Sequence, residues 1–277
     1  MKRLGTLASN ILRTWLVPLA LTMALVPAAH AQLWQSVQQR GTLRCAAPLY
    51  PPLVIKDPKT QEYSGVYLDL CREFGEQVLG VKVAFVDTTW DNIIAGLQSG
   101  KWDISPALNH TPKRALAVRF STSASYSELD VVYDPKNPKM QNVTTALESL
   151  DQPDITFGVV SGTAHDHTIS RRLKQARIMR LPSIDEVRLA LLSRRVDATV
   201  DEVDTNRIFL MQYPGRFASV NPVPALQKQG MGFGLPHQTS SADTAVLDIF
   251  INEKVALGEV DELFKRYSQQ IIDQSKQ

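Results

Sequence analysis

"SGVYLDLCREFGEQVLGVKVAFV" (64–86) joins a helix pattern directly to a strand pattern, and this unit decides the fold class. Apolar residues recur at helical spacing up to Gly80, and glycine commonly closes a helix. From Val81 to Val86 a short run rich in apolar and β-branched residues is typical of a buried strand. The stretch therefore predicts a helix packed on a sheet, the building block of an α/β protein.

The same alternation continues on both sides of this unit. Residues 88–100 predict a helix, and residues 183–194 predict another that opens with a capping box, Ser183 and Glu186. Two further helices are expected near the C-terminus, the longer at 241–257. Strands are expected at 42–46, 102–108, 128–133, 155–160, 177–181, 196–200 and 231–235.

Residues 1–31 carry the marks of a targeting segment. Lys2, Arg3 and Arg13 precede an apolar run of 13 residues, "WLVPLALTMALVP", and small residues follow up to Ala31. A basic start, a short apolar centre and a small-residue end predict a cleavable signal peptide. The run is shorter than the roughly 20 residues that span a membrane. We therefore expect a periplasmic protein of residues 32–277, cleaved after Ala31.

Charge and length limit what residues 32–277 can do. Without the signal segment, the chain has 27 Lys and Arg residues and 28 Asp and Glu residues. A near-neutral chain is a poor candidate for binding nucleic acid or an anionic membrane surface, so we expect neither partner. We expect a monomer.

Two βα blocks follow one another along the chain, each small enough to form its own lobe. Segments near 128–133 and 220–230 are the candidate crossings between them. We expect a first lobe from residues 32–128 and 222–277, and a second from 129–221. Ligands bind at the carboxyl ends of such strands and between such lobes.

The two cysteines and the histidine pair give no sign of metal or catalytic chemistry. Cys45 and Cys71 can both point into one core, where a disulfide and two buried thiols remain equally open. His165 and His167 are two positions apart and do not share a helix face. We expect no metal site, no cofactor and no catalytic residue.

A helix start at Thr111 carries an unusual charge. Thr111 is a natural cap and Pro112 suits the first helical position. The N-terminus of a helix favours acidic side chains, yet Lys113 and Arg114 follow. Either both side chains are solvated, or an anion binds at this helix end.

The chain resembles the family 3 periplasmic solute-binding proteins, the amino-acid-binding receptors of ABC importers. The resemblance spans nearly all of 38–270 and implies a two-lobed type II periplasmic binding protein fold. It also implies one small polar ligand and a membrane permease as partner. It is carried by "RGTLRCAAPLYPPLV" (40–54), "SGVYLDLCREFGEQVLG" (64–80), "WDNIIAGLQSGKWDIS" (90–105), "TPKRALAVRFS" (111–121), "FGVVSGT" (157–163) and "RRVDATVDE" (194–202).

By this resemblance Arg114 holds the α-carboxylate of the ligand, Asn109 adds a donor, and Thr163 grips the carboxylate from the other lobe. Tyr50 and Trp90 match positions where the family packs flat side chains against the ligand.

The ligand amine requires an acid at the end of the strand 196–200. The family spacing from Asp197 gives Glu202, and a one-residue deletion gives Asp201 instead. Adjacent strand residues point to opposite faces, so we expect only one of the two to reach the cleft.

The family pattern is not complete, because Pro106 and Ala107 offer no side-chain hydrogen bond. A small carboxylate other than an amino acid therefore remains an alternative ligand. Two other functions remain open. One is an exported cyclohexadienyl (arogenate) dehydratase on the same fold, with Glu202 or Asp204 as the acid. The other is a soluble accessory or sensory receptor.

Overall fold

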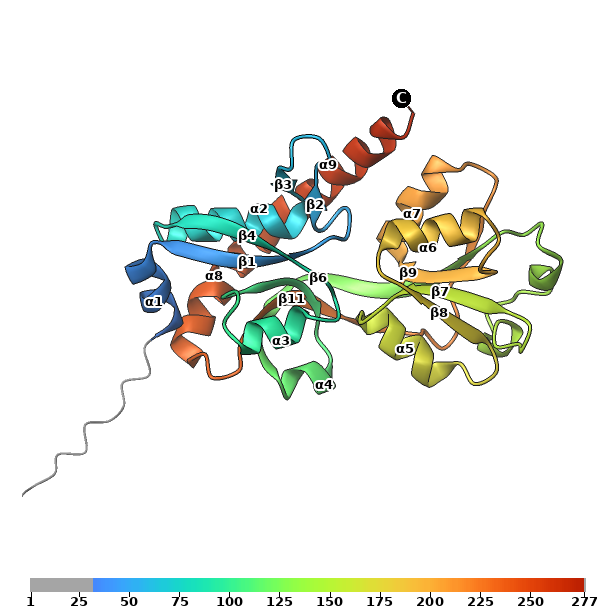
Figure 1. Cartoon of the computed structure of the whole chain (residues 1–277), viewed down its shortest axis with the longest axis horizontal. Coiled ribbons are helices and arrows are strands. Elements are labelled where there is room, and N and C mark those ends of the chain that lie inside the picture. The colour runs from blue at the N-terminus through green and yellow to red at the C-terminus, as the bar shows by residue number, and fades with distance from the viewer. Residues whose placement is uncertain (1–31, 277) are drawn as a thin grey trace, which may run out of the picture. The chain divides into compact units, whose positions relative to one another are not determined.

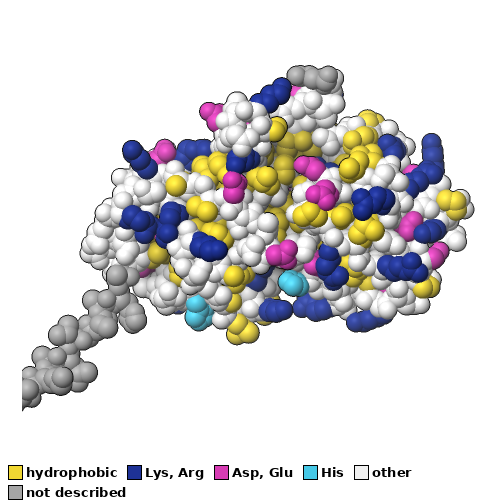
Figure 2. All heavy atoms as spheres, in the orientation of Figure 1, with side chains coloured by type: hydrophobic (Ala, Val, Ile, Leu, Met, Phe, Trp, Pro, Cys, Tyr) yellow, Lys and Arg dark blue, Asp and Glu magenta, His cyan; other side chains and the backbone are white. Residues whose placement is uncertain are grey.

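The computed structural model describes residues 32–276. The predicted signal peptide and its cleavage site lie outside the described residues. These residues group into one compact unit. Within the described part of the chain, no helix is both long and apolar enough to cross a membrane. Figure 2 shows basic and acidic side chains intermingled on the visible face.

Strands and helices alternate along the chain, which confirms the α/β class. The helices are α1 (Leu33–Arg40), α2 (Val66–Glu73), α3 (Ile93–Gln98), α4 (Pro112–Ala115), α5 (Ala164–Arg172), α6 (Ile184–Leu192), α7 (Val203–Gln212), α8 (Ser241–Ala256) and α9 (Glu259–Gln274). The strands are β1 (Thr42–Pro48), β2 (Ile55–Lys56), β3 (Tyr63–Ser64), β4 (Lys82–Thr88), β5 (Ser105–Asn109), β6 (Val118–Tyr133), β7 (Thr156–Val160), β8 (Arg177–Leu181), β9 (Ala198–Glu202), β10 (Ala218–Val220) and β11 (Lys228–Pro236).

The long strand β6 belongs to both lobes (Figure 1). Its first part, up to Glu128, pairs antiparallel with β11, and its last part, from Leu129, pairs antiparallel with β9. The strand order is β5-β11-β6-β9-β7-β8, with β10 also on β6. The returning chain runs beside β6, since the Leu129 amide donates to the carbonyl of Gln227 at 3.3 Å. This arrangement places two α/β lobes on either side of a pair of crossing strands.

A disulfide joins the core of the first lobe. β1 and β4 pair in parallel, and α2 packs on them. Cys45 of β1 and Cys71 of α2 are both fully buried and are bonded to each other. The structure thus decides between the two alternatives that the sequence left open.

Two predicted elements begin at least about five residues away from the observed ones. The helix expected at 88–100 begins only at Ile93, because the preceding residues form a turn closed by the Asn92 amide on the Thr89 carbonyl. The strand expected at 128–133 begins ten residues earlier, at Val118. The added segment is rich in Ser and lacks a clear apolar alternation. Its strand conformation is fixed by pairing with β11, which local sequence does not reveal.

Candidate functional site

The unusual helix start is α4, a single turn between β5 and β6. Thr111 caps it as expected, since its Oγ1 accepts from the Arg114 amide at 3.2 Å, and Pro112 takes the first helical position. The two cations that follow have different surroundings. Lys113 is exposed, whereas only 7% of Arg114 is accessible to solvent. Arg114 is therefore not a simply solvated cation.

The guanidinium of Arg114 lies between the lobes with part of its hydrogen-bonding capacity unused. Its Nη2 donates to the carbonyl of Gly162 at 3.4 Å. Its Nη1 is buried and has no hydrogen-bond partner within the described chain. Burial lowers the pKa of Arg114 to about 10, so the side chain remains charged at neutral pH. A buried cation with a free donor is destabilising until an anion pairs with it.

Gly162 contacts Arg114 from the other lobe, in the turn between β7 and α5, and Thr163 follows it in the chain. The φ angle of Gly162 is +73°, and a Cβ there would lie 2.5 Å from Oδ1 of Asp91. Only glycine permits this approach. The Thr163 hydroxyl caps α5, because it accepts from the Asp166 amide at 3.1 Å and donates to the Val160 carbonyl at 2.8 Å. A contact between Thr163 and a ligand stays a prediction.

Both carboxylates at the end of β9 reach the first lobe. The Tyr50 hydroxyl donates to Oδ1 of Asp201 at 2.5 Å, and Nδ2 of Asn109 donates to Oε1 of Glu202 at 3.4 Å. These contacts join the lobes and do not involve a ligand, so which of the two acids reaches a ligand stays a prediction. Glu202 ends the strand and also forms the N-cap of α7, so the chain turns at this residue.

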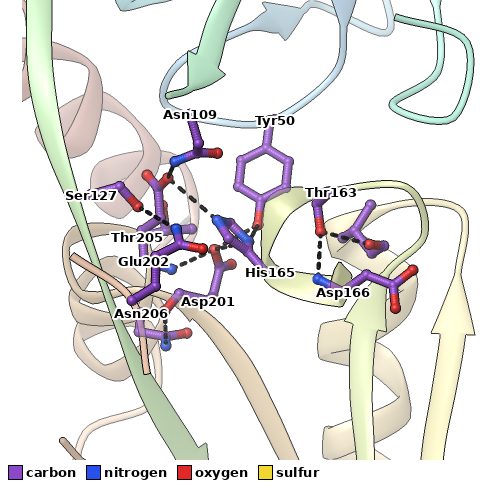
Figure 3. A network of polar contacts seen from close by, with 12 residues as sticks. Tyr50, Asn109, Ser127, Thr163, His165, Asp166, Asp201, Glu202, Thr205 and Asn206 are labelled. Carbon is purple, nitrogen blue, oxygen red and sulfur yellow. Dashed lines mark hydrogen bonds and ion pairs between the residues drawn. The ribbon is translucent and has the colours of Figure 1, made fainter. Parts of the chain in front are cut away.

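The imidazole of His165 lies at the centre of these groups (Figure 3). Its Nε2 is 3.4 Å from Oε1 of Glu202, and its Nδ1 is 3.4 Å from the Tyr50 hydroxyl and 3.8 Å from Oδ1 of Asp201. We did not expect a role for His165 from the sequence. The available signal was its place two residues after Thr163, in the first turn of a helix that follows a strand end.

Most of the predicted site residues surround one very small cavity. Its volume is about 10 Å³, close to the minimum that holds one water molecule. The rings of Tyr50 and Trp90 meet edge to face with centroids 5.6 Å apart. A ligand therefore needs the His165 ring to move or the lobes to separate. The lining is Tyr50, Leu53, Trp90, Ala107, Asn109, Thr163, Ala164, His165, Glu202 and Met231, without Arg114 or Asp201.

The backbone of this cavity includes one strained residue. Ala107 has a φ of +54°, in the left-handed region that disfavours residues with a Cβ. Such strain costs about 1–2 kcal/mol and tends to gather at functional sites. Ala107 and Asn109, two positions apart in β5, both line the cavity.

Two further buried acidic residues, Asp201 of β9 and Asp130 of β6, lie near Glu202. Burial raises the pKa of Asp201, and the nearby charge of Glu202 acts in the same direction, while His165 and Tyr50 oppose it. One layer further, Nδ2 of Asn206 donates to Oδ1 of Asp130 at 2.5 Å. Burial raises the pKa of Asp130 to about 6. The second lobe thus presents a concentration of carboxylates to a site whose opposite end holds the cation Arg114.

Comparison with known proteins places this architecture in a family. The chain belongs to the bacterial extracellular solute-binding proteins, family 3, whose family model matches residues 43–270. A probable histidine-binding protein of Campylobacter jejuni is 27% identical over 225 residues, which cover 80% of this chain and 82% of that protein. The cyclohexadienyl dehydratase of Pseudomonas aeruginosa is 25% identical over 198 residues, or 67% of this chain and 68% of that enzyme.

A solved structure supports the same assignment. The crystal structure of an ancestral amino acid-binding protein, described as a precursor of cyclohexadienyl dehydratase, matches with a TM-score of 0.74. It is 27% identical, and the match covers 86% of this chain and 99% of that one. The family resemblance and the two-lobed binding-protein fold predicted from the sequence are confirmed.

Proposed function

We propose that this protein is a periplasmic receptor that captures an amino acid between its lobes and delivers it to an ABC-type permease. The family and the relatives described as histidine-binding and amino acid-binding support this proposal. We take residues 1–31 as the signal peptide. The first lobe consists of residues 32–128 and 222–277, and the second of residues 129–221.

The observation that carries the proposal is the opposite charge at the two ends of the site. Arg114 is buried with a free Nη1, and Glu202 lines the small cavity. Trp90 and Ala164 line that cavity and also a second cavity that contains Arg114, so they lie between the two charged ends. An α-carboxylate on Arg114 and an α-amine on Glu202 would match both charges of an amino acid.

Ligand capture would work through lobe closure, without covalent chemistry. The bonds from Tyr50 to Asp201, from Asn109 to Glu202 and from Arg114 to Gly162 connect residues far apart in the chain across the cleft. A ligand shifts the balance of open and closed forms only by its differential affinity for them. A ligand that binds the closed form more tightly than the open form therefore favours closure and gives the permease a distinct surface.

Thermal melting tests the proposal. The purified protein is unfolded and refolded to remove bound ligand, then melted with each amino acid. At 100 times its dissociation constant a ligand adds about 2.7 kcal/mol of stability, which raises the melting temperature by several degrees. Arg114→Ala should abolish the rise, whereas Arg177→Ala, an exposed control, should retain it. An Arg114→Ala protein with full affinity would exclude this mode of binding.

A dehydratase is the second candidate, favoured by one contact. Nε2 of His165 lies 3.4 Å from Oε1 of Glu202, which places an acid and a base side by side in the site. Steady formation of phenylpyruvate from prephenate, lost in Glu202→Gln, would establish the enzyme. Saturable binding of an amino acid without turnover supports the receptor.

A further inference from the structure

A second cavity of about 630 Å³ lies between α4 of the first lobe and α5 of the second. Cavities of this size accommodate small molecules. It shares only Trp90 and Ala164 with the small cavity around His165. Its lining is Trp90, Asp91, Ile94, Thr111, Pro112, Lys113, Arg114, Ala117, Gly162, Ala164, His167, Thr168, Arg171 and Gln229.

Basic side chains enter this cavity from both lobes. Lys113 and Arg114 come from α4, and His167 and Arg171 come from α5. Asp91 is the one acidic side chain in the lining, and its Oδ1 also accepts from the Ser161 hydroxyl at 3.2 Å. Three permanent positive charges therefore surround the space against one negative charge.

Three residues of the lining also carry hydrogen-bond donors that have no acceptor. Nη1 of Arg114, Nε1 of Trp90 and Nε2 of Gln229 are buried without a partner in the described chain. All three are donors, and buried polar groups rarely remain unpaired. In the same part of the chain, two larger or comparable grooves, of about 840 and 480 Å³, contain no such atom in their linings.

The pKa of His167 is affected by the same positive charges. Burial lowers the pKa of His167, and the positive charges of Lys113, Arg114 and Arg171 lower it further, while Asp166 opposes them. Like charges on α4 and α5 face each other across the lobe boundary, so they repel when the lobes approach. An acceptor-only group with negative charge between the helices would remove this repulsion and pair the free donors.

We propose that the cavity between α4 and α5 is an oxyanion site, held by Lys113, Arg114 and Arg171 with Gln229 and Trp90 as donors. The oxyanion is either a small free anion such as inorganic phosphate or a second acidic group on the captured amino acid. An α-carboxylate on Arg114 does not require Lys113 and Arg171, so the proposed site includes more positive charge than the binding of an amino acid's α-carboxylate needs. Only the second source rests on the proposed amino-acid receptor function.

Isothermal titration of the refolded protein with inorganic phosphate, at constant ionic strength, tests the site. Lys113→Gln/Arg171→Gln removes two exposed cations of the cavity and should weaken phosphate binding at least tenfold. The control Lys101→Gln/Arg177→Gln removes the same amount of charge from exposed positions outside the cavity and should leave phosphate binding unchanged. Equal weakening by both pairs would show an effect of net charge alone and overturn the proposal.

A second titration distinguishes the two sources, with aspartate and glutamate against asparagine and glutamine. If the acidic amino acids bind at least tenfold tighter and the Lys113/Arg171 pair abolishes this preference, the oxyanion belongs to the ligand. If phosphate still binds when the protein is saturated with an amino acid, the oxyanion is a free anion and not part of the ligand. If neither phosphate nor the acidic preference is found while an amino acid binds, the oxyanion site is wrong and the receptor function stands. Phosphate binding without any amino-acid binding supports the site and contradicts the receptor function.

Discussion

The hydroxyl of Tyr50 lies 2.5 Å from Oδ1 of Asp201 and donates a hydrogen bond from one lobe to the other. The two residues are 151 positions apart, and both are almost fully buried. Burial raises the pKa of Tyr50 well above its usual value, and the charge of Asp201 adds to the effect. The phenol therefore remains a donor at any physiological pH, and the bond stabilises the closed arrangement.

Tyr50→Phe should favour the open form. The variant keeps the ring beside Trp90 but removes a donor from a buried carboxylate, which costs about 1–3 kcal/mol. Small-angle scattering without ligand should show a larger radius of gyration than the wild type. Tyr63→Phe serves as a control, since Tyr63 packs on Phe85 of the first lobe. Identical scattering from Tyr50→Phe and the wild type would contradict a closing role for this bond.

Arg114→Gln should weaken ligand binding and stabilise the free protein. Burial lowers the pKa of Arg114 from 12.5 to about 10, so its charge destabilises the fold by about 1–3 kcal/mol at neutral pH. The group is protonated in folded and unfolded chains below about pH 9, so the gain should be constant over neutral pH. Urea unfolding without ligand measures it. A less stable Arg114→Gln protein would show that the guanidinium is already compensated.

Glu202→Gln and Asp201→Asn should show which of the two carboxylates binds the ligand amine. Glu202 lines the cavity, so its loss should reduce amino-acid affinity by about 2–5 kcal/mol, as for one partner of a buried charge pair. Asp201 bonds Tyr50 and the Glu202 amide, so Asp201→Asn should change affinity less. Titration calorimetry on both variants makes the comparison. The reverse order would assign the ligand amine to Asp201.

His165→Ala should broaden the range of ligands. The imidazole fills the space between Tyr50 and Glu202 and competes for the carboxylate that we assign to the ligand amine. Its removal should raise affinity for bulky amino acids about tenfold, or about 1.4 kcal/mol. Thermal shifts over all amino acids, with the exposed His237→Ala as control, measure the range. An unchanged range would mean that His165 moves aside freely or that ligand binds elsewhere.

Asp130 should make stability depend on pH. Its pKa is about 6 in the folded protein against 3.8 as the ordinary value, so the folded state binds the proton more tightly. This stabilisation is complete below about pH 4 and is lost as pH rises through about 6. Asp130→Asn keeps an acceptor for Asn206, and should exceed the wild type in stability by up to about 3 kcal/mol near pH 8, with little difference near pH 4.

Denaturant unfolding at both pH values measures the effect, with the exposed Asp154→Asn as control. A constant difference between Asp130→Asn and the wild type at the two pH values would mean that Asp130 does not titrate abnormally.

The elements that were predicted well are those whose signal is local. The stretch 64–86 forms a helix and a strand, and Thr111 and Ser183 cap helices as expected, because a cap needs only the next three residues. Of the residues that line the small cavity, the family pattern predicted Tyr50, Trp90, Asn109, Thr163 and Glu202, but not His165. Their roles toward a ligand stay predictions.

Other features depend on contacts between distant segments, and the sequence did not reveal them. The Ser-rich start of β6 is a strand because β11 pairs with it, and His165 matters because closure brings it between Tyr50 and Glu202. The same holds for the charge at α4. That Lys113 and Arg114 follow a helix cap is evident from the order of the residues. That Arg114 is buried and Lys113 is exposed is evident only in the folded protein, because burial depends on what the opposite lobe places against each side chain.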